Sequence, residues 1–164
     1  MTNNDILRRI RYTFDFDDSK MMRLLSSDSQ EINQQISREQ MSNWLKKDDD
    51  PDYQECKDVQ LAIFLNNLID ENRGKKEGAQ PQLEKHLTNN IILRKLKIAL
   101  NLKDEDILDM MALAEFTISK HELSALFRKK GHKHHRVCKD QILRNFLQGM
   151  QIKYRPKDYY KQDK

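Results

Sequence analysis

Residues 2–25, TNNDILRRIRYTFDFDDSKMMRLL, recur at residues 88–111 as TNNIILRKLKIALNLKDEDILDMM, at an offset of 86 and without a gap. A second block, residues 36–65, aligns with residues 118–147 at an offset of 82. The first copy is therefore four residues longer between its two blocks. Because helix caps, apolar positions and cysteines agree in order, the sequence predicts a tandem duplication.

Each copy is predicted to form four short helices. The first helix begins after Thr2 or Thr88, because threonine is a favoured N-cap and apolar residues follow at helical spacing. The third is indicated by an S-x-x-E capping box at Ser119 and Glu122, with Ser37 as its counterpart. The other starts are predicted near Asp17, Asp18 and Asp104, and after Asp58 and Asp140. We expect an all-α protein of two tandem homologous four-helix repeats packed together with pseudo-twofold symmetry.

Charge separates the two repeats. The predicted organisation is an acidic repeat at 1–72, a linker at 73–87, a basic repeat at 88–152 and a flexible tail at 153–164. The linker is predicted from NRGKKEGAQPQ, which contains two glycines and a proline. The formal net charge is +4 for the whole chain. It is distributed as −4 over the first 80 residues and +8 over the remaining 84.

Composition excludes several functional classes. The chain has 164 residues, 34% of them charged, and a mean hydropathy of −0.91. It lacks an apolar run of about 18 residues, and its N-terminus lacks the apolar stretch of a signal peptide. It contains no phosphate-binding glycine loop, no GxSxG and no HExxH. We expect a cytoplasmic, non-enzymatic protein without a cofactor or a membrane partner.

Several stretches resemble a known family. They are NDILRRIRY, SREQMSNWLKKDDDPDYQEC, LAIFLNNLIDENRGKK and the second NNIILRKLKIAL. The chain resembles the YehS-like family of small bacterial proteins over approximately Asn3 to Met150, most specifically at Trp44 to Asp52 and in the duplicated first helix. The resemblance implies a duplicated helical bacterial cytoplasmic protein of unknown function. It implies no reaction, cofactor or catalytic residue.

The sharpest contrast between the repeats follows the third helix. The first copy has an acidic stretch there, and the second has a basic stretch with three histidines. The acidic candidates are Asp48, Asp49, Asp50 and Asp52, and the basic candidates are Lys120, Arg128, Lys129, Lys130, Lys133 and Arg136. Blocks of like charge form either solvated faces or interaction surfaces. Our main hypothesis is a protein-interaction or self-associating module in which the acidic half of one molecule meets the basic half of another.

The alternative hypothesis is nucleic-acid binding. Residues 104–113, the short connection 114–117 and residues 119–130 resemble a helix-turn-helix, with basic residues available to phosphates or base edges. The corresponding connection in the first copy is about ten residues, which is too long for this motif. Only the second repeat therefore qualifies.

A metal site is a weaker hypothesis. His132, His134 and Cys138 are weak metal-ligand candidates, because imidazole and thiolate bind transition metals. The neighbouring Lys133 and Arg136 disfavour a cation, so a solvated basic loop is the preferred interpretation and no metal is expected.

Other repeated residues favour structural interpretations. Cys56 and Cys138 each lie two residues before a predicted helix N-cap, which suggests small buried side chains; reactive thiols are the alternative. Trp44 is predicted to be a core residue from its spacing to neighbouring apolar residues. The repeated Asn3-Asn4 and Asn89-Asn90 lie in first helical turns, where asparagine satisfies backbone donors. A polar pocket where the copies meet is the alternative for these asparagines.

Overall fold

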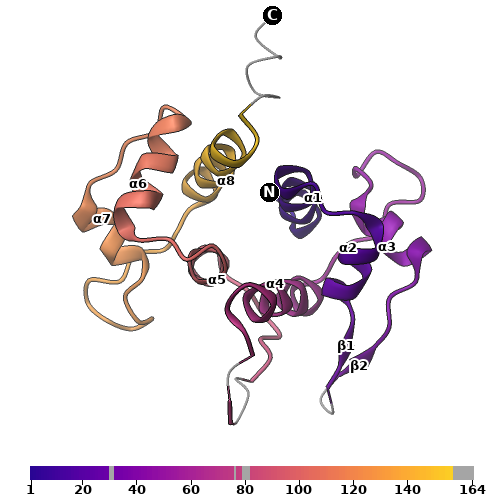
Figure 1. Cartoon of the computed structure of the whole chain (residues 1–164). Coiled ribbons are helices and arrows are strands. Elements are labelled where there is room, and N and C mark those ends of the chain that lie inside the picture. The colour runs from indigo at the N-terminus through magenta and orange to yellow at the C-terminus, as the bar shows by residue number, and fades with distance from the viewer. Residues whose placement is uncertain (30–31, 76, 79–81, 157–164) are drawn as a thin grey trace, which may run out of the picture. The chain divides into compact units, whose positions relative to one another are not determined.

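The computed structural model describes residues 1–29, 32–75, 77–78 and 82–156, and most of them are helical (Figure 1). The chain divides into two compact units, Met1–Leu87 and Thr88–Lys164. The mostly helical fold agrees with the predicted all-α class, apart from one short hairpin. Within the described ranges, every helix is too short or too polar to span a bilayer.

The described residues of the first unit form four helices and one hairpin. α4 packs against α1 and α2, and α3 also packs against α1 and α2. Buried apolar side chains from these helices form the core, and Trp44 belongs to it as predicted, with 5% of its surface exposed. The elements are α1 (Asn3–Phe14), α2 (Asp18–Leu25), β1 (Ser27–Asp28), β2 (Asn33–Gln34), α3 (Arg38–Leu45) and α4 (Asp58–Arg73).

The second unit contains four helices among its described residues. α8 packs along α6 and also contacts α5, and α7 packs on α6. Its core includes Leu93, Leu143 and Phe146, which are fully buried. The helices are α5 (Asn89–Ala99), α6 (Asp104–Leu113), α7 (Lys120–Leu126) and α8 (Asp140–Tyr154).

Five helix starts have the predicted caps, whereas α6 begins after Lys103 and Asp104 does not cap it. The hydroxyl oxygens of Thr2, Ser37, Thr88 and Ser119 each accept a hydrogen bond from the backbone amide three residues later. Asp17 caps α2 in the same way. Side-chain acceptors at these positions satisfy first-turn amides that have no partner within the helix.

The fourth helix of each unit starts differently from the prediction. Lys57 and Lys139 are the N-caps, so each cysteine directly precedes the cap instead of lying two residues before it. Lysine has no side-chain acceptor. In α4 the Gln60 Oε1 accepts from the Lys57 amide instead, at 2.8 Å.

The end of the second unit also differs from the prediction. α8 continues through Lys153 to Tyr154, two residues past the predicted end of the repeat at residue 152. Ile152 is buried, with 4% of its surface exposed, so core packing holds this last turn. The rest of the predicted tail, residues 157–164, lies outside the described residues.

The sequence did not predict the hairpin between α2 and α3. β1 and β2 are antiparallel, with Ser27 opposite Gln34 and Asp28 opposite Asn33. The four residues by which the first copy is longer lie in this connection. The hairpin is therefore specific to the first unit among the described residues (Figure 1).

Candidate binding sites

Asn4 closes the loop that follows α3. This loop, residues 46–57, is called the acidic loop below. Asn4 Nδ2 donates to the Trp44 carbonyl at 2.9 Å and the Gln54 carbonyl at 2.8 Å, and Asn4 Oδ1 accepts from the Cys56 amide at 3.0 Å. The asparagine is completely buried. One side chain in the first turn of α1 thus joins both ends of the acidic loop.

Asn90 does the same in the second unit, where residues 128–139 are called the basic loop. Its Nδ2 donates to the Leu126 carbonyl at 2.9 Å and the Arg136 carbonyl at 2.8 Å, and its Oδ1 accepts from the Cys138 amide at 2.8 Å. Asn4 and Asn90 each satisfy a backbone donor, as predicted, but this donor is a loop amide and not an amide of the first helical turn. Their partners lie in distant loop backbone, which local sequence does not reveal.

The two loops have the same internal hydrogen bonds. In each, backbone amides donate to carbonyls at equivalent positions, offset by 82 residues. In the acidic loop the bonds, donor first, are Asp50 to Lys47, Tyr53 to Asp50 and Gln54 to Asn43. Their equivalents in the basic loop, in the same order, are His132 to Lys129, His135 to His132 and Arg136 to Ala125. A side-chain acceptor is also shared: Asp52 N donates to Asp50 Oδ1 at 2.9 Å, and His134 N donates to His132 Nδ1 at 3.0 Å. The loops share this bonding pattern although their charges are opposite.

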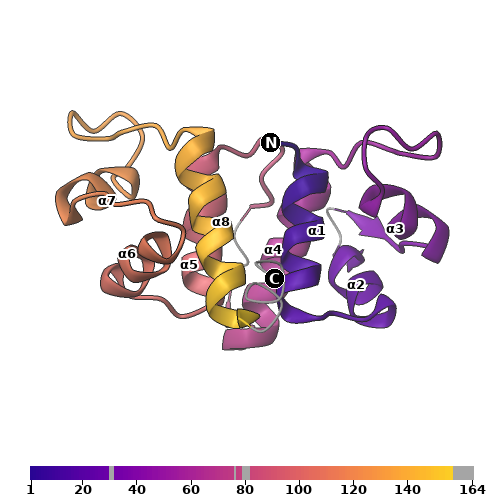
Figure 2. The same ribbon diagram turned by 90° about the horizontal axis from the view of Figure 1, so that it is seen from above.

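An arginine of the first helix fixes the start of each loop. Arg8 Nη1 donates to the carbonyl of Lys46, the C-cap of α3, at 2.8 Å. Arg94 Nη2 donates to the carbonyl of Phe127, the C-cap of α7, at 2.7 Å. A cation at a helix C-terminus is stabilising, because it lies at the negative end of the helix dipole. Figure 2 shows each loop projecting beyond the helices of its own unit.

The basic candidates lie mainly in the basic loop. The prediction that residues 119–130 form one helix is wrong, because α7 ends at Leu126. Its last carbonyls are taken by Asn90, Arg94 and the Arg136 amide, so the chain turns away. The side chains of all six basic candidates are exposed. Lys120, on α7, pairs with Glu105 at 3.2 Å. For the other five no ion pair is recorded with a described residue: Arg128, Lys129, Lys130, Lys133 and Arg136.

The acidic candidates are also largely accessible. Asp48, Asp49 and Asp52 are exposed, and Asp50 is half-buried. None of the four is recorded in an ion pair with the described part of the chain. The pKa of Tyr53 is raised, first by desolvation and then by the nearby carboxylates of Glu55 and Asp48. The Tyr53 hydroxyl donates to Asn4 Oδ1 at 3.1 Å and adds a fourth bond to the closure of the acidic loop.

The metal candidates do not form a ligand set. The rings of His132 and His134 lie 5.5 Å apart between centroids, and both residues are exposed. Cys138 is buried and its thiol donates to the Lys139 carbonyl. Among the described residues, no group of three or more His, Cys, Asp or Glu side chains could hold a metal ion.

Both cysteines are buried, as predicted, and have free thiols, with 1% of Cys56 and 2% of Cys138 exposed. Burial raises the pKa of the Cys56 thiol to about 12 and that of the Cys138 thiol to about 11. Nucleophilic thiol chemistry requires the thiolate. The arrangement therefore favours a packing role over a reactive one.

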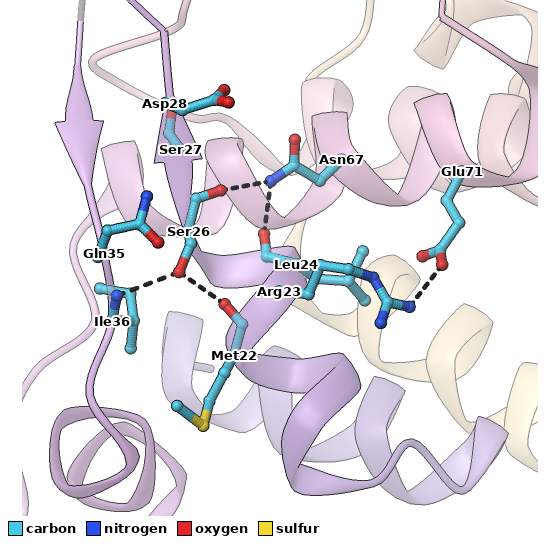
Figure 3. Close-up of a pocket in the computed structure, with 10 residues that line it drawn as sticks. All are labelled: Met22, Arg23, Leu24, Ser26, Ser27, Asp28, Gln35, Ile36, Asn67 and Glu71. Carbon is cyan, nitrogen blue, oxygen red and sulfur yellow. Dashed lines mark hydrogen bonds and ion pairs between the residues drawn. The ribbon is translucent and has the colours of Figure 1, made fainter.

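A cavity of about 630 Å³ lies at the base of the hairpin in the first unit (Figure 3). The Ser26 hydroxyl joins the two ends of the connection, since it donates to the Met22 carbonyl at 2.8 Å and accepts from the Ile36 amide at 3.1 Å. Asn67 on α4 donates to the carbonyls of Leu24 and Ser26, at 2.8 and 2.9 Å. The sequence does not reveal this cavity, because its walls come from separate segments.

The two regions of the duplication also match one family model. Residues 3–74 and 89–155 match the family described as "Protein of unknown function (DUF1456)". The chain belongs to this family. It is 42% identical over 152 residues to "Uncharacterized protein YehS" of Escherichia coli (strain K12), an alignment covering 92% of this chain and 94% of that relative. No solved structure matches the chain. The predicted family resemblance is confirmed, and the function of this family is unknown.

Proposed function

We propose that the chain is a non-catalytic binding module that self-associates, with the acidic loop of one molecule bound to the basic loop of another molecule. The observation that carries this proposal is the shared hydrogen-bond pattern of two loops with opposite charge. Both loops are anchored at each end by an asparagine, so little loop ordering would oppose binding.

Charge complementarity supports this pairing. At positions 48–55 the acidic loop carries five carboxylates, and the equivalent positions 130–137 carry three Lys or Arg side chains and three histidines. Complementary charges raise association rates and disfavour wrong partners. Each molecule carries one acidic loop and one basic loop, so head-to-tail contacts can close into rings or continue as filaments.

The helix-turn-helix alternative receives less support from the geometry. In that motif the first helix crosses the phosphate backbone. Here the first turn of α6 carries Asp104, Glu105 and Asp106, and Glu105 already neutralises Lys120. Carboxylates facing phosphates would repel them. The proposed partner is therefore a second molecule of this chain, and nucleic-acid binding through the basic loop is the alternative result that the sedimentation experiment below can reveal.

We also infer that the units are copies of one four-helix module, related by a pseudo-twofold axis. The matching loop bonds support the common module, as do the pairs Arg11–Asp18 at 2.6 Å and Lys97–Asp104 at 2.7 Å. A crystal structure in which superposition of the units requires a rotation near 180° would agree with this arrangement. A rotation far from that value would contradict the symmetry.

Sedimentation velocity of the full chain tests self-association. We expect association that weakens as salt rises from about 0.1 M to about 1 M, because the Debye length falls from about 10 to about 3 Å. Lys130→Glu should weaken association, whereas Lys85→Glu, the same charge change at an exposed site outside both loops, should not. A monomer under all conditions would contradict the proposal, as would a monomer that retains duplex DNA at low salt.

A further inference from the structure

The cavity of the first unit exists because two features differ from the second unit. Asn67 aligns with Gly149 at the offset of 82, and the hairpin occupies a connection that is shorter in the second copy. At Gly149 a Cβ atom would lie 1.8 Å from the Met110 carbonyl oxygen, so α6 and α8 touch there. In the first unit the Asn67 side chain stands between α4 and the equivalent carbonyl, that of Leu24. The amide therefore separates two helices that touch in the second unit.

The same amide has a fixed orientation. Asn67 donates its two Nδ2 hydrogens to two carbonyls, and no hydrogen bond to Asn67 Oδ1 is recorded among the described residues. In Figure 3 the Nδ2 atom faces Leu24 and Ser26, and the oxygen lies on the opposite side of the amide group. The site therefore presents an acceptor that rotates only if both donated bonds break.

The charged side chains around the cavity are predominantly acidic. Asp28 and Glu71 are carboxylates, and Arg23 is the one cation among the described residues that line the cavity. Arg23 Nη2 is paired with Glu71 Oε1 at 2.7 Å, and the described residues place no cation on the carboxylate of Asp28. α2 ends beside the cavity at Leu25, and Glu71 lies in the last turn of α4. Helix C-termini carry partial negative charge, so both helix ends add to a potential that attracts cations.

The lining also includes the apolar side chains of Met22, Leu24 and Ile36, beside polar residues such as Ser26, Ser27 and Gln35. A bare metal ion does not fit, since the described residues place no three candidate ligands together. We propose that this cavity binds an organic cation with an aliphatic stem, either a lysine side chain of a peptide or a free diamine. The stem would lie on the apolar residues, and the ammonium would reach Asp28 and Asn67 Oδ1.

Nuclear magnetic resonance titration of the ¹⁵N-labelled full chain tests this site. The probes are N-acetyl-lysine methylamide, 1,4-diaminobutane and the uncharged analogue N-acetyl-norleucine methylamide. We expect saturable shifts of the Asn67 side-chain amide and the Ser26 and Ser27 backbone amides with both cations. The uncharged norleucine probe should bind at least about fivefold more weakly than the lysine probe, because it lacks one partly exposed ion pair. Tighter binding of the peptide analogue or of the diamine would identify the source of the cation.

Two variants separate this site from general charge attraction and from the proposed self-association. Asp28→Asn should weaken cation binding about fivefold. Asp49→Asn removes the same charge from the acidic loop, so it should weaken self-association and leave cation binding unchanged. Asn67→Gly, which mimics the second unit, should also reduce binding. Equal effects of Asp28→Asn and Asp49→Asn, or an absence of saturable shifts at the three reporter residues, would overturn the proposal.

Discussion

Gly149 lies so close to Met110 that a Cβ atom at this position would come within 1.8 Å of the Met110 carbonyl oxygen and 2.5 Å of its carbonyl carbon. The obstacle is backbone, which cannot rotate away as a side chain can. Contact between α6 and α8 therefore depends on glycine at this position.

Gly149→Ala should destabilise the protein by about 2–3 kcal/mol, because the helices must move apart to admit the methyl group. Urea denaturation followed by circular dichroism measures the change. Arg144→Ala, at an exposed position on the same helix, is the matched control and should change the free energy of unfolding little. An unchanged stability for Gly149→Ala would show that the helices are not in contact there.

Asn4→Ala should cost about 3 kcal/mol, because it leaves two carbonyls and the buried Cys56 amide without partners. Trp44 is the only tryptophan of the chain, so its fluorescence during urea denaturation reports on the first unit. The control is Asn33→Ala, an exposed asparagine on β2. A loss below about 1 kcal/mol for Asn4→Ala would mean that the asparagine does not hold the loop.

Both cysteines should resist iodoacetamide at about pH 8 in the folded protein, because each thiol is buried and its pKa is raised. The same protein in denaturant, where both thiols are accessible, should react completely. Mass spectrometry measures the alkylation at each residue. Rapid labelling of Cys56 or Cys138 under native conditions would contradict the buried placement.

Stability should fall at alkaline pH. The Cys56 pKa is raised from an ordinary value of 9.0 to about 12, so the folded state keeps a proton that the unfolded chain loses. This contribution is complete below about pH 9 and is lost as pH rises toward about 12, by at most about 1.4 kcal/mol per pH unit. Cys56→Ala should show a shallower decline of unfolding free energy across this window. An identical pH dependence in both proteins would contradict the shift.

The sequence predicted the helices well because their signals are local. Thr2, Ser37, Thr88 and Ser119 each act on an amide only three residues away. The hairpin escaped prediction because β1 and β2 have two residues each, too few to show strand alternation.

The candidate sites were harder to predict because their contacts are not local. The exposed charges of both loops were evident from the sequence. The loops' shared closure was not, because Asn4 and Asn90 bind backbone 36 to 52 residues away. Nor does any short segment identify Asn67, whose partners Leu24 in α2 and Ser26 just after it lie 43 and 41 residues before it.

Exchange of the two loops tests the proposed pairing of the acidic loop with the basic loop. One variant carries KGHKHHRV, the sequence of residues 130–137, at positions 48–55, and the other carries DDDPDYQE, the sequence of residues 48–55, at positions 130–137. The closing asparagines bind loop backbone, so both variants should fold. A third variant with both exchanges keeps one loop of each sign and serves as the control.

In sedimentation velocity at low salt, each single-exchange variant alone should be monomeric, because its two loops carry like charge. A mixture of the two should associate as the natural chain does, and the double-exchange variant should associate on its own. If the single-exchange variants associate alone, or if their mixture stays monomeric while the natural chain associates, the proposed pairing of acidic and basic loops is wrong.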